Sequence, residues 1–310
     1  METETLYYEP LVWVVTDKEE GWKVRSVMHT RMGISRKLTS AVKQTERGVL
    51  LNGERVYVGR YVKAGDVLEI RMEQEESTDI MPQPIPFEVL YEDDAILVVN
   101  KPAGLIVHPT QGHYLNTLAN GVVHYWRERG DRRRFRPIHR LDQDTSGVMA
   151  IAKTAHAQEV VSQQMHRDIT RKQYLAFVFG TLPEVAGVVD GPIDRDPLDP
   201  HRRIVTPTGA RARTHYEVVE TFGGASMVRL RLETGRTHQI RVHMTALGCP
   251  LLGDAYYGNE ASQSLLAMGR QALHAELLAF HHPVSGEWME FRAPWPADFV
   301  DLHERLKGLN

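Results

Sequence analysis

The first 75 residues show short apolar runs separated by turn residues. Ser35 is a candidate N-cap for a helix that runs to Thr45, and Asn52-Gly53 between two apolar runs is a strong signal for a tight hairpin. The pattern predicts a small α+β unit over residues 1–75. Its elements are strands at 11–15 and 67–70, a helix at 35–45, a hairpin at 49–56 and a turn at 63–66.

An acidic, proline-containing stretch follows this unit. Residues 73–79 are polar and mostly acidic, and prolines stand at positions 82, 84 and 86. The stretch has no apolar periodicity, and proline stiffens it. We therefore expect residues 76–86 to be a linker to a second domain, which extends over residues 87–310.

Strands and helices mix irregularly in the second domain. Without a steady strand–helix–strand rhythm a Rossmann fold is disfavoured, and the pattern predicts an α+β domain with a mixed, mostly antiparallel central sheet. We expect strands at 95–100, 148–153, 174–179 and 227–233, helices at 117–129 and 154–167, and a third helix capped by Thr237 and closed by Gly248.

The composition is that of a globular, water-soluble protein. No apolar run approaches the roughly 20 residues that span a bilayer. The N-terminus lacks the features of a secretory signal, and the single cysteine, Cys249, cannot form an internal disulfide. We expect a cytoplasmic protein with no membrane association.

The balance of basic and acidic residues indicates whether the chain as a whole is suited to bind nucleic acid. The 37 basic residues are outnumbered by 40 acidic ones, so the chain as a whole is not marked as a nucleic-acid binder. Seven arginines nevertheless lie between Arg127 and Arg140. Such a run is either a solvated face or a phosphate-binding patch, and we favour phosphate contact because the run leads into the loop described next.

Residues 139–147 form the most informative stretch. Asp142 lies beside His139 and Arg140 at the entrance of a buried-looking strand, where a catalytic acid is well placed, although a tight polar turn would look the same. Asp144 is a competing carboxylate, and spacing does not choose between the two. Three further charged segments lie next to apolar strands and suggest one shared site: 101–109, 171–174 and 236–243.

The order of these motifs resembles the RluA-type pseudouridine synthases over about residues 87–300. That family converts uridine in RNA to pseudouridine without a cofactor, a metal or an energy source. The matching motifs are Lys-Pro-Ala-Gly from position 101, His-Arg-Leu-Asp from 139, Lys-x-Tyr-x-Ala from 172, Gly-Arg-Thr-His-Gln-Ile-Arg from 235 and Leu-Leu-Gly-Asp from 251.

The resemblance implies three catalytic residues. Asp142 would act on the ribose, either as a nucleophile or by removing a ribose proton to give a glycal, and the sequence leaves both routes open. Arg236 would pair with Asp142 and keep it ionised, and Tyr174 would stack on the extruded uracil. Asp144 would then brace the loop through backbone N–H groups.

The resemblance also implies further contacts with the substrate. An enzyme acting on structured RNA must extrude the target nucleotide, which requires groups that hold it outside the helix. The expected groups are His139, Arg140, Thr145, His238 and Gln239. The 15 histidines show no tight zinc-ligand spacing and there is no cysteine pair, so no metal site is expected.

The N-terminal unit resembles the RNA-binding domain named after ribosomal protein S-four. The resemblance lies in residues 34–37, 48–53 and 62–66, and it implies RNA contact by Arg36, Lys37 and Lys43. A solvated helix face is the alternative for these cations. By analogy with the family, the expected partner is RNA, and ribosomal RNA of the large subunit is favoured over transfer RNA.

Other classes of function stay open at this point. A non-catalytic RNA-binding or RNA-folding factor would keep the architecture but is expected to have degenerate catalytic loops, whereas Asp142, Tyr174 and Arg236 are all present. A hydrolase of small molecules that uses Asp142 and His139 is a more distant alternative. No obligate protein partner is evident, and we expect a monomer.

Overall fold

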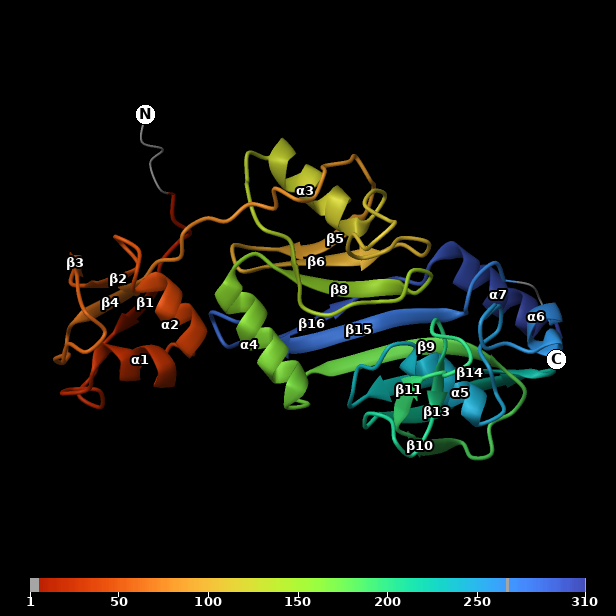
Figure 1. Ribbon diagram of the computed structural model, residues 1–310. Helices are drawn as coiled ribbons and strands as arrows, with labels where there is room; N and C mark the ends of the chain where they lie inside the picture. Colours follow the sequence, from red (N-terminus) through yellow and green to blue (C-terminus); the bar gives the residue numbers. More distant parts are fainter. Residues whose placement is uncertain (1–5, 266–267, 310) are drawn as a thin grey trace.

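A ten-stranded mixed sheet is the centre of the computed structural model, which describes residues 6–265 and 268–309 (Figure 1). Its strands lie in the order β10-β13-β14-β9-β15-β8-β6-β5, with β16 paired to β15 and β7 to β8. Within the described residues only β8 and β15 pair in parallel, which confirms the predicted α+β fold with a mostly antiparallel sheet. The bounds are β5 Glu88–Glu92, β6 Ile96–Lys101, β7 Arg136–Pro137, β8 Ser146–Ala152, β9 Arg171–Phe179, β10 Ala186–Asp190, β13 Arg213–Phe222, β14 Ala225–Leu232, β15 Leu273–His281 and β16 Trp288–Arg292.

Helices cover both faces of this sheet, so its central strands are apolar on both sides. Strand β8 is buried at all seven positions. Alternate residues of β9 show the division: Ala176 lies in the cluster with α3 and α5, whereas Phe177 packs against α7. Helix α4 packs on β8 from the side of Val148. The helices are α3 Leu118–Glu128, α4 Ala155–His166, α5 Gln239–Ala246, α6 Glu260–Ser264 and α7 Ala297–Lys307, and a small separate sheet pairs β11 Ile193–Arg195 with β12 Arg203–Val205.

Capping side chains set the starts of the helices. Ser35, Thr117 and Thr154 each accept a hydrogen bond from a backbone N–H in the first turn, at the positions that the sequence predicts. The prediction for Thr237 was wrong. Helix α5 begins one residue later, after His238, whose backbone is in the left-handed region with φ 57°. The helix ends before Gly248, as predicted, and that residue takes a φ of 77°.

The N-terminal unit has its own four-stranded sheet and core. Both residues of the Asn52-Gly53 turn have positive φ, 53° and 81°, which identifies the predicted hairpin as a tight turn of the type that matches strand twist. Strands lie in the order β1-β4-β2-β3 and two helices pack beside them. The bounds are β1 Leu11–Val14, α1 Val24–Thr30, α2 Arg36–Val42, β2 Val49–Leu51, β3 Glu54–Arg55 and β4 Val67–Ile70.

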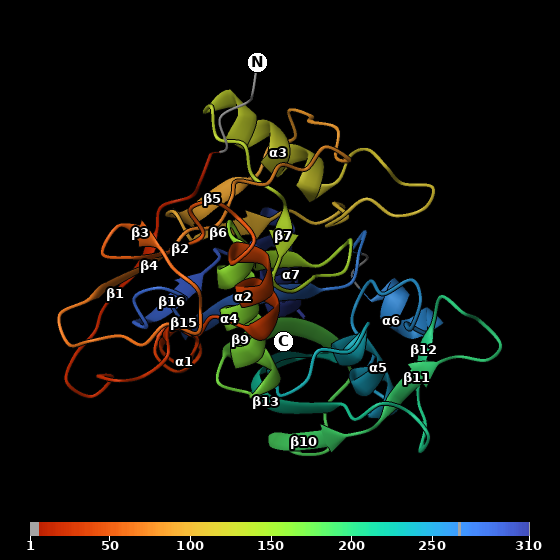
Figure 2. The same cartoon turned by 60° about the vertical axis from the view of Figure 1, so that its left-hand side comes forward.

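The segment between the two sheets is held against the second one. Ser77 accepts a hydrogen bond from the backbone N–H of Phe135, and Ile80 is buried in the main core. Helix α2 lies next to α4 in both views (Figures 1 and 2), and Ala155 at the start of α4 packs against the N-terminal core. These contacts connect the N-terminal unit to the helix that borders the site described below. None of the described helices is long and apolar enough to cross a membrane.

Candidate active site

A cavity of about 760 Å³ lies between the loop before β8, strand β9 and the start of α5. The charged segments of the sequence meet there, as their positions beside apolar strands suggested. Every candidate of the second domain lines this cavity: Asp142, Tyr174, Arg236, His139, Arg140, Thr145, His238 and Gln239. Arg36 and Lys37 do not line it, since they are exposed on α2 in the N-terminal unit.

Asp142 is paired with Arg241. An Nη of Arg241 lies 3.5 Å from a carboxylate oxygen of Asp142, and the Asp142 side chain is 25% exposed to the cavity. Arg241 is itself buried, and its Nε and second Nη donate to the two oxygens of Asp254 at 2.7 and 2.8 Å. Burial alone would lower the pKa of Arg241, but its bonds to Asp254 and the nearby Asp142 raise that pKa overall. Arg241 is thus a fixed cation beside Asp142.

The pairing that we expected of Arg236 is therefore made by Arg241, and this corrects the prediction. Arg236 lies in the turn before α5, where its side chain is exposed and its Nε donates to the backbone carbonyl of Arg211. Arg241 is at the third position of the helix, and its side chain points into the protein. The two arginines are five residues apart in one motif, Arg236 before the helix and Arg241 within it.

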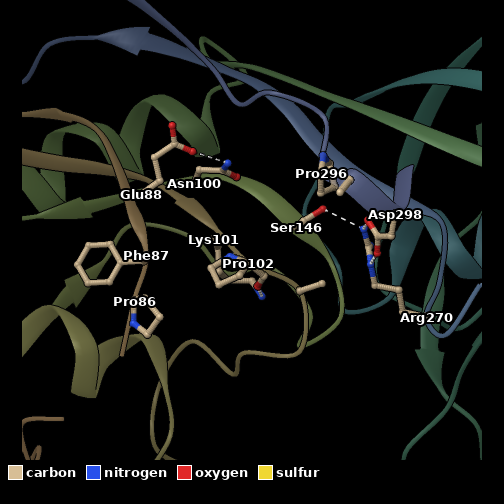
Figure 3. A pocket seen from close by; sticks show the side chains of 12 residues that line it. Pro86, Phe87, Glu88, Asn100, Lys101, Pro102, Ser146, Arg270, Pro296 and Asp298 are labelled. Carbon is tan, nitrogen blue, oxygen red and sulfur yellow. Dashed lines mark hydrogen bonds and ion pairs between the residues drawn. The ribbon is translucent and has the colours of Figure 1, made fainter. Parts of the chain in front are cut away.

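Two buried cations hold the loop of Asp142 in place. The Nζ of Lys101 donates to three backbone carbonyls, including that of Gln143, and an Nη of Arg270 donates to the carbonyl of Asp144. Lys101 and Arg270 both line a second cavity, of about 620 Å³ (Figure 3). Asp144 was expected to brace the loop with its side chain. Among the described residues it makes no side-chain bond to a backbone N–H, and its carbonyl is the bonded group.

Gly147 ties the end of the loop to the sheet. Its φ is 118°, and a Cβ there would lie 2.1 Å from the carbonyl oxygen of Ala275 on β15. Only glycine fits this conformation and this close approach. The position of Asp142 is therefore set both by side-chain bonds and by direct backbone packing.

Tyr174 lies on β9 and is 8% exposed. Burial, and then the neighbouring Asp142 carboxylate, raise the pKa of Tyr174. The phenol therefore stays protonated at neutral pH, and its ring forms an apolar wall of the cavity. Stacking on a base is chemistry that such a ring can perform.

Three of the side chains predicted to contact the substrate form hydrogen bonds within the protein. The Nε2 of His139 accepts a hydrogen bond from the backbone N–H of Ala150, and burial followed by the charge of Lys172 lowers the pKa of His139 to about 3. Gln239 is buried, and its amide bonds Thr234, Arg236, Arg213 and Thr214. Thr145 is 2% exposed. These side chains shape the cavity more than they present free groups to a ligand.

His238 borders the cavity at the start of α5. Its Nδ1 lies 2.8 Å from the hydroxyl of Tyr257, which also accepts the backbone N–H of Arg203. Which of the two groups donates in this hydrogen bond depends on the tautomer of His238. Burial lowers the pKa of His238, so the ring is a neutral N–H donor in a strained backbone position.

Six of the seven arginines in the run contact groups of the chain itself, and phosphate contact by the run stays a prediction. Glu75 and Glu76, in the acidic stretch before the prolines, provide most of the partners. Arg140 is exposed at the cavity rim and has no carboxylate partner among the described residues. The others bind as follows: Arg127 and Arg132 to Glu76, Arg134 and Arg136 to Glu75, Arg133 to Asp131 and Asp94, and Arg129 over the ring of Tyr125.

Sequence reasoning missed three residues of the site: Arg241, Asp254 and Lys172. All three lie inside motifs already quoted, two positions or more away from the residues that were chosen. A buried arginine requires a carboxylate partner, and the Leu-Leu-Gly-Asp motif supplies one. That requirement is the signal that could have identified the Arg241–Asp254 pair.

The site shows no metal-binding cluster. Within the part of the chain that the structure describes, no group of three or more histidine, cysteine or acidic side chains could hold a metal ion.

Comparison with known proteins identifies the family. The model of the RNA pseudouridylate synthase family matches residues 95–246. An uncharacterised RNA pseudouridine synthase of Bacillus subtilis, YjbO, is 39% identical over 280 residues, which are 90% of this chain and 96% of that protein. The chain belongs to the RNA pseudouridine synthase family. As a member it is an isomerase that converts uridine in RNA to pseudouridine.

Other RNA pseudouridine synthases agree with this assignment. The ribosomal large subunit pseudouridine synthase D of Pasteurella multocida is 43% identical over 272 residues, covering 84% of this chain and 83% of that protein. The solved structure of human RNA pseudouridylate synthase domain containing 4 has a TM-score of 0.58 at 26% identity and covers 71% of this chain and 93% of that one. The human domain containing 1 gives a TM-score of 0.57 at 27% identity, with 69% and 85% covered.

Proposed function

We propose that this pseudouridine synthase modifies large-subunit ribosomal RNA and that Asp142 is its catalytic carboxylate. The observation that carries the proposal is the Asp142–Arg241 pair inside the cavity, 3.5 Å apart. The arginine provides a fixed positive charge beside a partly buried carboxylate, which could either attack the ribose or remove a ribose proton. The relatives named for the large ribosomal subunit support the choice of RNA.

Tyr174 and Arg140 complete the proposed site. The base of the target uridine leaves the RNA helix and enters the cavity, where the Tyr174 ring stacks on it. Arg140 at the rim binds a backbone phosphate. Turning the freed uracil within the cavity brings its carbon 5 to the anomeric carbon, and the proton on carbon 5 then leaves.

The N-terminal unit is proposed to be a separate domain, residues 1–75, that binds RNA. Arg36 and Lys37 are exposed at the start of α2, and neither forms an ion pair among the described residues. Helix α2 lies next to α4, so an RNA bound there can extend toward the catalytic cavity (Figure 2). We propose that the enzyme acts as a monomer, in the cytoplasm.

Substitution of Asp142 tests the proposal. Asp142→Asn should fold and bind a large-subunit ribosomal RNA transcript but form no detectable pseudouridine, whereas the matched variant Asp144→Asn should remain active. Pseudouridine is mapped by its carbodiimide adducts. Isomerisation by Asp142→Asn would refute the assignment of this carboxylate. RNA binding by the wild-type enzyme without isomerisation of any transcript would favour a binding factor.

A further inference from the structure

Lys172 lies in the active-site cavity and has not been assigned any role. It is on β9, two residues before Tyr174, so the two side chains project from the same face of the strand. Both line the cavity that contains Asp142. Lys172 as a whole is only 9% exposed, and its Nζ is not one of the fully enclosed unpartnered atoms of the described residues.

Two other buried lysines of the second domain have protein partners for their ammonium groups. Lys101 donates to three carbonyls, and Lys153 lies 2.8 Å from Glu92. The described residues offer the Lys172 Nζ no hydrogen-bond acceptor and no carboxylate within ion-pair distance. Burial lowers the pKa of Lys172, and the charge of Asp168 offsets this in part. The nearby His139 is neutral, because burial and then the charge of Lys172 lower its pKa to about 3. A buried cation without a partner is costly unless a ligand supplies one.

The depth of Lys172 decides which part of the substrate can reach it. The phosphates of a nucleic acid follow the protein surface, where the exposed Arg140 is available. The part of a flipped nucleotide that enters a cavity is the base. The polar atoms of uracil that a cation can contact are its two carbonyl oxygens, O2 and O4.

We propose that Lys172 contacts a carbonyl oxygen of the flipped uracil and stabilises the negative charge that the ring takes up during isomerisation. The bond between C1′ and N1 breaks, and its electron pair passes to the ring, where O2 and O4 share the charge. After the ring turns, that pair forms the bond between C5 and C1′. The proton on C5 then passes to water and N1 takes up one proton from water, so the exchange leaves the number of protons unchanged. Lys172 keeps its own protons throughout.

This proposal rests on the proposed function, and its test separates the two. Lys172→Met keeps the bulk of the side chain and removes the charge, and Lys172→Arg keeps a charge. Lys307→Met, on the far helix α7, is the control. Single-turnover rates at saturating RNA and the Kd for a ribosomal RNA transcript are measured for each variant, and thermal unfolding checks the fold. If Lys172→Met does not fold, Lys172→Gln replaces it.

The expected result is a loss of about 100-fold in the single-turnover rate of Lys172→Met with little change in Kd, as for removal of a charge-stabilising donor. Lys172→Arg should be faster than Lys172→Met. A rate loss of less than about tenfold overturns the proposal. So does a weakened Kd with a normal rate at saturation, which would assign Lys172 to a phosphate. A wild-type enzyme inactive on every RNA would instead overturn the proposed function.

A second substrate tests the charge itself. RNA with 5-fluorouridine at the target carries an electron-withdrawing atom that stabilises the same anion. The defect of Lys172→Met, measured as the disappearance of intact 5-fluorouridine, should be smaller on this RNA than on the unmodified one. An equal defect on both RNAs contradicts the proposed role.

Discussion

Arg241 contacts Asp142 through one nitrogen while Asp254 binds its other two. The Asp142 contact is the longest of the three, 3.5 Å against 2.7 and 2.8 Å. Asp254 is fully buried and also accepts the backbone N–H groups of Tyr256 and Tyr257. Asp254 therefore fixes the orientation of the Arg241 guanidinium. The positive charge beside Asp142 is in place before the reaction and does not need to move.

Asp254→Asn should slow isomerisation without weakening RNA binding. An amide offers one acceptor oxygen where the carboxylate offers two, so Arg241 loses its bidentate anchor. We expect a fall of about 10- to 100-fold in the single-turnover rate, as small misplacements of catalytic groups cause. The Kd for RNA measured in parallel should be close to that of the wild type. A normal rate would show that Asp254 has only a structural role.

Arg241 and Arg236 should respond in opposite ways to removal. Arg241→Ala leaves the buried Asp254 without its partner, and the free energy of unfolding should fall by about 3–5 kcal/mol with loss of activity. Arg236→Ala removes an exposed side chain. The free energy of unfolding should change by less than about 0.5 kcal/mol, and the rate at saturating RNA should stay within about twofold of wild type. Chemical denaturation and rate measurements on the two variants check this. The reverse pattern would restore Arg236 as the partner of Asp142.

Gly147→Ala should be strongly destabilising. The added Cβ would overlap the Ala275 carbonyl, and the residue would need a φ of 118°. Together these effects should cost about 2–5 kcal/mol in the free energy of unfolding. Gly59→Ala is the control, since an added Cβ there meets no atom within 4 Å. Similar unfolding midpoints for the two variants would contradict the close approach of the loop to β15.

His139 should make the folded state sensitive to acid. Its pKa is lowered from 6.5 in the unfolded chain to about 3 in the folded protein, so the unfolded state binds a proton first as the pH falls. Stability should therefore decline between about pH 6.5 and pH 3. His139→Gln keeps an acceptor for the Ala150 N–H but cannot be protonated in this range. Its unfolding temperature, followed against pH, should fall less steeply than that of the wild type.

Local patterns predicted much of the fold because local chemistry determines it. The N-caps Ser35, Thr117 and Thr154 act within one turn of their own helix, and the Asn52-Gly53 hairpin requires only its own dihedral angles. The predicted start of α5 was one residue too early. His238 adopts a left-handed conformation and takes the N-cap position, and its residue type alone does not predict that conformation.

The identity of the arginine beside Asp142 did not depend on that helix start, because Arg236 precedes the helix and Arg241 lies within it whether the cap is Thr237 or His238. The pairing needs Asp254, which comes from a loop beyond the end of the helix. The pairing of the arginine run with Glu75 and Glu76 likewise joins residues 51 or more positions apart, and no periodicity reports such contacts.

The pairing of Glu75 and Glu76 with the arginine run bears on how the enzyme behaves in a solution full of RNA. Each arginine already bound to a carboxylate is one less cation that can displace counterions from a passing strand. Unselective binding of polyanions is thereby reduced, while Arg140 at the rim of the cavity has no carboxylate partner among the described residues. An RNA strand that offers only phosphates therefore meets few unpaired cations. A strand that can also extrude a base meets Arg140 at the rim and Lys172 in the cavity.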